Sequence, residues 1–207
     1  MIMATAETFY YQGNECFDKK DYVNAIECYQ KSLERKNEYF EAWFNKGLAH
    51  AMLDEYENAL FCYRQALELD PDDPDTWINM GAVYNKQTDY HAAVECYQRI
   101  INANPMHTEA WYNLGVTYKQ LEEYSQAIIA LQKAIEFDSD NAETWFAMGN
   151  VYGRLGAHFM EIDCYEKVLE LDPAHLLSQI LLCDISDEHA QQFDRLKTEL
   201  LCDFSLI

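Results

Sequence analysis

Basic residues are scarce in this sequence. Its 207 residues include 15 lysines and arginines against 36 aspartates and glutamates, which gives a formal net charge of −21 at pH 7. A field of that sign repels the phosphates of nucleic acids and of anionic lipids. The composition therefore argues against nucleic-acid and membrane partners. It favours a basic protein or peptide as partner, although solubility alone would also explain the charge.

Long apolar runs are also missing. No stretch approaches the roughly 20 residues that a helix needs to cross a bilayer. The opening residues MIMATAE contain neither the basic segment nor the apolar core of a secretory signal. We therefore expect a cytoplasmic protein.

Motifs that would carry chemistry are absent as well. We find no glycine-rich phosphate loop, no His-Glu-x-x-His, no nucleophile elbow and no Cys-x-x-Cys. Cys16 and His50 occupy equivalent positions in neighbouring repeats, which core packing explains without a catalytic pair. The sequence predicts no enzyme, no cofactor and no metal site.

Glycine is rare, and its placement is the most informative feature of the chain. Five of the seven glycines are spaced 34 residues apart, at Gly13, Gly47, Gly81, Gly115 and Gly149. An aromatic residue precedes each by four positions: Phe9, Trp43, Trp77, Trp111 and Trp145. Alanine follows the first four by twelve positions, at Ala25, Ala59, Ala93 and Ala127, and a tyrosine or leucine comes four residues later. A fixed period of this length indicates a stack of small helical units that bury their faces against their neighbours.

The pattern resembles the tetratricopeptide repeat family. From Trp77 to Pro105 the chain carries Trp-x-x-Met-Gly-x-x-Tyr, then alanine, tyrosine and proline, which is close to the whole family signature. The resemblance implies an all-α fold, a right-handed superhelical solenoid of helix-turn-helix repeats with a C-terminal helical cap.

The period predicts where the repeats begin and end. Residues 1–5 form an N-terminal extension, and residues 6–173 form five repeats: 6–39, 40–73, 74–107, 108–141 and 142–173. Residues 174–207 are expected to leave the pattern and to form capping helices over the last repeat. The alternative is a homodimer formed through this C-terminal segment, because its ending LLCDFSLI is rather apolar for a surface in water.

In proteins with the fold that this resemblance implies, the first helices line a concave groove that holds ligand peptides. Equivalent positions of these helices form columns. The acidic column is Glu7, Glu41, Asp75, Glu109 and Glu143, and the apolar column is Tyr10, Phe44, Ile78, Tyr112 and Phe146. The asparagine column contains Asn45, Asn79 and Asn113, with Tyr11 and Ala147 at its ends. The fourth column is Asn14, Leu48, Ala82, Val116 and Asn150.

From these columns we predict a peptide-binding groove. Its residues are Tyr10, Asn14, Glu41, Phe44, Asn45, Leu48, Asp75, Ile78, Asn79, Glu109, Tyr112, Asn113, Val116, Phe146 and Asn150. Apolar residues would anchor ligand side chains, amides would bond the ligand backbone, and carboxylates would attract lysine or arginine. Each column also has a structural explanation. First-turn carboxylates stabilise the helix dipole, apolar residues pack against adjoining helices, and a recurring asparagine can reflect repeat drift.

The sequence thus favours a protein-interaction scaffold that binds a peptide with apolar and basic residues. Two alternatives stay open: a self-associating structural module that uses its C-terminal helices, and an accessory repeat domain of a larger enzyme complex. Some relatives clamp acidic chaperone C-termini with asparagines and basic residues. This chain has Tyr10, Asp75 and Asn79 at the basic positions of that clamp, so we do not carry that function over.

Overall fold

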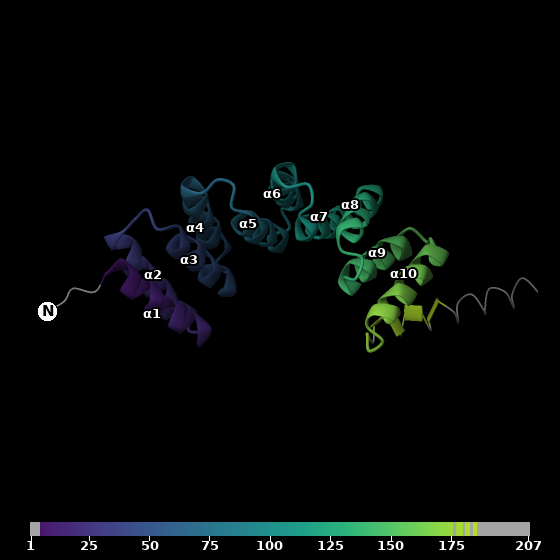
Figure 1. The fold of residues 1–207 in the computed structure, drawn as a ribbon, viewed down its shortest axis with the longest axis horizontal. Coiled ribbons are helices and arrows are strands. Elements are labelled where there is room, and N and C mark those ends of the chain that lie inside the picture. Colours follow the sequence, from purple (N-terminus) through teal and green to yellow (C-terminus); the bar gives the residue numbers. More distant parts are fainter. Residues whose placement is uncertain (1–4, 176, 180, 183, 186–207) are drawn as a thin grey trace, which may run out of the picture. The chain divides into compact units, whose positions relative to one another are not determined.

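The computed structural model describes residues 5–175, 177–179, 181–182 and 184–185, and within these it is helical without strands (Figure 1). The helices are α1 (Ala6–Asp18), α2 (Tyr22–Arg35), α3 (Phe40–Met52), α4 (Tyr56–Leu69), α5 (Pro74–Lys86), α6 (Tyr90–Ala103), α7 (Thr108–Gln120), α8 (Tyr124–Phe137), α9 (Ala142–Arg154) and α10 (His158–Leu171). The chain divides into two compact units, Met1–Thr117 and Tyr118–Ile207, with the division inside α7. The all-α class and the consecutive helix pairs agree with the sequence prediction.

A tight turn joins the two helices of each pair, and it always uses the left-handed backbone region at the same position. The residues there are Lys20, Asp54, Thr88, Glu122 and Gly156, with φ between 57° and 69°. This region costs little for glycine but is unfavourable for a β-branched residue. The turn geometry therefore repeats even where the amino acid is unsuited to it.

A glycine on the first helix and a tyrosine on the second explain how closely the helices of a pair approach. A Cβ atom added at Gly13, Gly47, Gly81 or Gly149 would lie 2.5–2.7 Å from the ring of Tyr29, Tyr63, Tyr97 or Tyr165, respectively. The alanines Ala25, Ala59, Ala93 and Ala127 are completely buried. Small residues thus permit the close crossing, and the tyrosine ring of the same pair fills the space.

The tryptophans hold the connectors between pairs. Trp77 Nε1 donates to Pro71 O and Trp111 Nε1 donates to Pro105 O, each at 2.8 Å. Trp43 and Trp145 make the same bond to the carbonyl six residues before them. The indole N–H groups thus fix the starts of α3, α5, α7 and α9, whereas α1 has Phe9 at this position.

The same contacts continue beyond residue 173. Gln179 Nε2 donates to Pro173 O at 2.8 Å, across the same six-residue interval as the tryptophan bonds. His175 Nδ1 accepts from Ser178 N at 3.2 Å, as His107 Nδ1 accepts from Ala110 N at 3.3 Å. His175 and Gln179 thus repeat two contacts of the earlier repeats. Whether the segment acts as a cap stays a prediction, and residues 186–207 lie outside the described residues.

Candidate peptide-binding surface

The acidic column lies at the starts of the first helices. Glu7, Glu41, Asp75, Glu109 and Glu143 are all exposed and stand in the first turns of α1, α3, α5, α7 and α9. Backbone hydrogen bonding and the Thr5 hydroxyl lower the pKa of Glu7, which is the expected effect of a helix N-terminus on a carboxylate. Across residues 5–175 and the described positions up to 185, none of these five carboxylates forms an ion pair within 4 Å.

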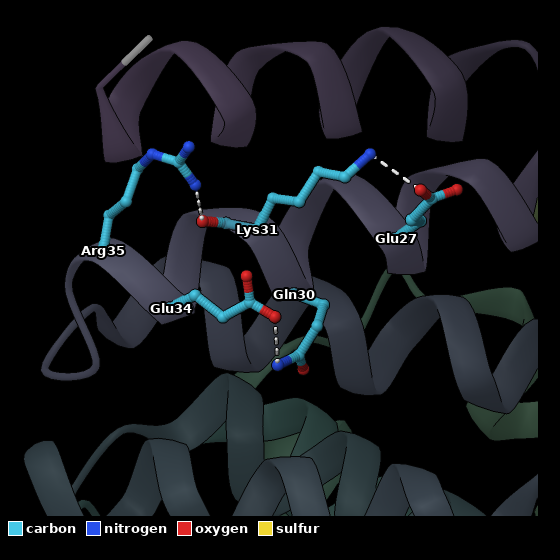
Figure 2. Close-up of polar contacts among 5 residues, drawn as sticks. All are labelled: Glu27, Gln30, Lys31, Glu34 and Arg35. Carbon is cyan, nitrogen blue, oxygen red and sulfur yellow. Dashed lines mark hydrogen bonds and ion pairs between the residues drawn. The ribbon is translucent and has the colours of Figure 1, made fainter. Parts of the chain in front are cut away.

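The outer face of α2 shows the opposite arrangement (Figure 2). Lys31 Nζ lies 2.7 Å from Glu27 Oε1, and Gln30 Nε2 donates to Glu34 Oε1 at 3.4 Å. Arg35 also donates to the carbonyl oxygen of Lys31 at 3.0 Å. The carboxylates of this second helix thus have polar partners on their own helix. Within the part of the chain that the structure describes, no lysine or arginine pairs with the acidic column, and only Glu7 has a hydroxyl partner, Thr5. Its negative charge is therefore available to an incoming group.

The apolar column is half-buried along its whole length. The ring centroids of Phe44 and the buried Tyr63 are 6.1 Å apart, and those of Phe146 and Tyr165 are 5.7 Å apart. Phe146 also contacts His175 at 4.8 Å. These residues support the tyrosines behind them, so packing explains part of the column, and their remaining exposed area is open to a ligand.

The asparagine column is less uniform than its sequence suggests. Asn45 Nδ2 donates to Tyr10 Oη at 3.2 Å and to Asn14 Oδ1 at 3.0 Å, which links α3 to α1. Asn79 Nδ2 donates to the carbonyl of Asp75 at 2.8 Å. Because both amide protons of Asn45 are used, only its Oδ1 remains for a ligand. Asn45 therefore has a structural role that its sequence position does not reveal.

The fourth column contains residues that complete the core. Asn14 Oδ1 accepts from Tyr29 Oη at 2.8 Å, and Asn150 Oδ1 accepts from Tyr165 Oη at 3.0 Å. Burial raises the pKa of both tyrosines, so these hydroxyls stay protonated and donate. Two of the predicted groove asparagines thus hold tyrosines in place, while Leu48 and Val116 of the same column are half-buried and apolar.

Sequence reasoning missed Asn85, which also bonds a buried tyrosine hydroxyl but stands outside the four columns. Its Nδ2 donates to Tyr97 Oη at 3.3 Å and to Thr117 Oγ1 at 2.9 Å. The available signal was the recurring tyrosine itself, because a buried hydroxyl requires a hydrogen-bonding partner. The Tyr97 hydroxyl therefore predicts a polar partner nearby, and Asn85 is that partner.

The predicted residues fall into both units. Those from Tyr10 to Val116 lie in the first unit, and Phe146 and Asn150 lie in the second. Within the first unit, the Asn45 bonds bring α1 and α3 together on one surface. We call the exposed faces of these four columns the first-helix surface, and each unit carries its own part of it.

A cavity of about 490 Å³ is lined by α2, α3 and α4, on the side of α3 opposite the first-helix surface. Its lining includes Val23 and Ile26 of α2, Lys46 and His50 of α3, and Phe61 of α4. His50 Nδ1 lies 2.6 Å from Glu55 Oε2, so its ring is held by a carboxylate. Cys62 also lines this space, and burial raises its pKa to about 11, which makes it a poor nucleophile near neutral pH.

These features define a protein built from tandem α-helix pairs, each with a recurring glycine position and most with an alanine and a tyrosine that close the crossing. Sequence profiles of the tetratricopeptide repeat match residues 40–73, 62–95, 96–129 and 142–175, and TPR repeat profiles match 13–54 and 117–156. The chain belongs to the tetratricopeptide repeat family.

Solved structures show the same fold at low sequence identity. MamA residues 41-end from Desulfovibrio magneticus RS-1 has a TM-score of 0.76 and 24% identity, covering 82% of this chain and 96% of that chain. Another MamA crystal structure has a TM-score of 0.72 and 23% identity, covering 78% and 94%. YrrB, described as a TPR protein with an unusual peptide-binding site, has a TM-score of 0.70 and 19% identity, covering 87% and 93%. The comparison with curated proteins finds no match.

No helix within the described residues is long and apolar enough to cross a membrane.

Proposed function

We propose that this protein is an interaction module whose first-helix surface binds a peptide segment of a partner protein. The observation that carries the proposal is the acidic column, whose five carboxylates are exposed and form no ion pair within the described residues. The partner segment would be rich in lysine or arginine and would also carry apolar side chains.

The charge of the column supports a basic ligand. Four of its members belong to the first unit and recur every 34 residues, one per first helix. A ligand crossing successive first helices would meet one carboxylate per helix. Such complementarity speeds encounter and excludes acidic partners more than it adds affinity. The net charge of −21 acts in the same direction at longer range.

Contacts beyond charge come from the other columns. Phe44, Ile78 and Tyr112 keep part of their surface exposed beside the acidic column, since each is half-buried. The free Oδ1 of Asn45 and the amide of Asn79 are suited to bonding the backbone of an extended peptide. YrrB, a TPR protein of the same fold with an unusual peptide-binding site, is a precedent for peptide binding by this fold.

The test replaces charges on matched surfaces. One variant carries Glu41→Lys, Asp75→Lys and Glu109→Lys, and its control carries Glu68→Lys, Glu95→Lys and Asp163→Lys, exposed carboxylates on second helices. Both variants change the net charge equally, so they separate a local surface from the overall field.

The probe is a displayed library of random peptides selected on the wild-type chain. We expect enrichment of peptides with basic and apolar residues, normal binding to the control, and association with the first variant that is slower and less sensitive to salt. Equal binding to both variants would contradict the proposal, as would selection of acidic peptides. Circular dichroism checks that both variants stay helical.

Self-association is a second candidate, favoured by apolar residues around the α9–α10 turn. Leu155, Phe159 and Met160 are 49%, 82% and 46% exposed, respectively. Clustered exposed apolar residues are typical of contact surfaces. Light scattering across a concentration series tests this: a mass that rises with concentration, and falls when Phe159 is changed to Ser, supports self-association. A constant monomer mass contradicts it.

A further inference from the structure

The second helices carry a column of fully buried side chains, four of them tyrosines whose hydroxyl groups require partners. We call Tyr29, Tyr63, Tyr97, Leu131 and Tyr165 the tyrosine column; all five are at most 1% exposed. Tyr29 and Tyr165 are paired with Asn14 and Asn150 of the fourth column, fifteen residues earlier. Ala82 holds that position before Tyr97, and there Asn85 bonds the hydroxyl instead.

The fourth pair shows that asparagine follows the need for it. Its member of the tyrosine column is Leu131, which has no hydroxyl, and the fourth column has Val116 at the matching position. Where a hydroxyl must be satisfied, an asparagine stands nearby; where none exists, an apolar residue replaces it. The hydroxyls of Tyr29, Tyr97 and Tyr165 thus each have an asparagine partner, which stands in the fourth column for Tyr29 and Tyr165 and at residue 85 for Tyr97.

Tyr63 is the exception among the four tyrosines. Tyr63 Oη is buried and has no hydrogen-bonding partner among the described residues. Leu48 occupies the position that Asn14 and Asn150 hold, and Ala51 occupies the position of Asn85. Leaving a buried hydroxyl without a partner destabilises a fold, so asparagine at residue 48 would serve folding better. Residues that conflict with the local needs of a fold are expected at functional positions.

The location of Leu48 explains what it could do. Glu41, Phe44, Asn45 and Leu48 are spaced three and four residues apart, so they share one face of α3. Leu48 and Phe44 are half-buried and pack against the core cluster that contains Tyr63 and Met80. Ala82, one repeat further along, is exposed and small. Leu48, Phe44 and Ala82 thus add apolar side chains to the helix faces that carry Glu41 and Asp75.

We propose that Leu48 is a specificity-determining residue, which together with Phe44 receives an aliphatic side chain of the bound peptide. The inference rests on the proposed peptide-binding function. The occupant is an aliphatic residue flanked by lysine or arginine, because exposed Glu41 and Asp75 are the neighbouring members of the acidic column. Asparagine at this position would satisfy Tyr63 but would present an amide to the ligand.

The first arm of the test measures urea unfolding of the full chain with Leu48→Asn or Leu48→Ala, each with Tyr63 and with Tyr63→Phe. Both substitutions remove the leucine, and only asparagine provides an acceptor for Tyr63 Oη. We expect Leu48→Asn to unfold at higher urea than Leu48→Ala when Tyr63 is present. The order should reverse with Tyr63→Phe, since alanine is the better helix former. The same order in both backgrounds would overturn the assignment of residue 48 as the partner position.

The second arm measures binding of a short lysine-rich peptide whose central residue is Ala, Val, Leu, Ile or Phe. We expect the wild-type chain to prefer the aliphatic guests over alanine by about tenfold, the discrimination usual for an apolar pocket. Leu48→Asn should lose most of that preference, because the difference between aliphatic guests and alanine depends on the contact with Leu48. Tyr63→Phe, which leaves the surface unchanged, should keep it.

The outcomes separate the two claims. If Leu48→Asn retains the full preference, Leu48 does not determine specificity, while the peptide-binding function stands. If the wild-type chain binds no member of the series and selects no basic peptide from the displayed library, the proposed function itself fails.

Discussion

The α5–α6 pair and the α9–α10 pair have the same helical plan but fill the space beside their tyrosine differently. In the first, Asn85 bonds Tyr97 and reaches Thr117 on the next helix, while Ala93 is fully buried. In the second, Gly153 stands at the position of Asn85, and Glu161 stands at the position of the alanine. Glu161 is only 7% exposed.

The two substitutions in the α9–α10 pair depend on each other. A Cβ atom at Gly153 would overlap Glu161 Oε1, so the glycine makes room for the carboxylate. Glu161 Oε2 in turn lies 3.1 Å from His158 Nδ1. A cavity of about 290 Å³ remains beside them, lined also by Asn150, Tyr165 and Ile185. The same helix-pair backbone therefore holds either a filled, hydrogen-bonded arrangement beside its tyrosine, as in α5–α6, or a more open arrangement with a charged residue, as in α9–α10.

The largest expected effect concerns the close glycine–tyrosine contact that both pairs share. Gly81→Val and Gly149→Val each place a branched side chain within 2.7 Å of a buried tyrosine ring. We expect each to lower the free energy of unfolding by about 3 kcal/mol, because a rigid ring cannot move away inside a packed core. Urea unfolding followed by circular dichroism provides the measurement. A loss below about 1 kcal/mol at either site would mean that the close crossing is not a common requirement.

The next largest effect concerns the hydrogen bonds of Asn85 in the α5–α6 pair. Asn85→Ala removes the bonds to Tyr97 and Thr117 and should cost about 2 kcal/mol, since a buried hydroxyl loses its partner. Asn79→Ala, on the outward side of the same helix, should change stability by less than about 0.5 kcal/mol. Equal losses for both variants would show that Asn85 contributes no more than an ordinary helix residue.

A graft from one pair to the other should reveal coupling. Gly153→Asn alone should destabilise because its side chain meets Glu161, and Glu161→Ala alone should leave a larger cavity. Together they reproduce the α5–α6 arrangement, and we expect the double variant to recover about 1–2 kcal/mol relative to the sum of the single losses. Denaturation of all four proteins completes the cycle, and strict additivity would refute the mutual dependence of the two residues.

The smallest effect lies in the turns. Thr88 in the α5–α6 turn has φ of 61°, and Gly156 in the α9–α10 turn has φ of 69°. Thr88→Gly should stabilise by about 0.5–1 kcal/mol because it relieves left-handed strain, and Gly156→Ala should destabilise by a similar amount. Thermal unfolding of each variant beside wild type measures both shifts. Opposite signs are the expected result, and a destabilised Thr88→Gly would argue against strain.

Several features of the surface were within reach of the sequence. The acidic column is exposed and the apolar column is half-buried, because helical periodicity places residues three, four and seven apart on one face. The partners of the amides were not predictable in this way. Asn14 and Asn45 look alike as potential ligand contacts, yet one accepts from Tyr29 and the other donates to Asn14. The sequence also concealed the continued register at residues 175–179, because glutamine does there what tryptophan does elsewhere.

By itself, the sequence determined the all-α class, the helix pairs and the family, because these follow from a 34-residue period and from local helical spacing. Only the tertiary structure decided which polar side chains serve the core and which face outward. That decision depends on helices brought together from distant parts of the chain: Asn45 meets Tyr10 across 35 residues, and Asn85 meets Thr117 across 32. The tertiary structure also shows that the Tyr63 hydroxyl beside Leu48 is buried without a partner among the described residues. Burial is what makes a missing hydrogen bond costly, so the sequence alone does not reveal that leucine at residue 48 is unfavourable for Tyr63.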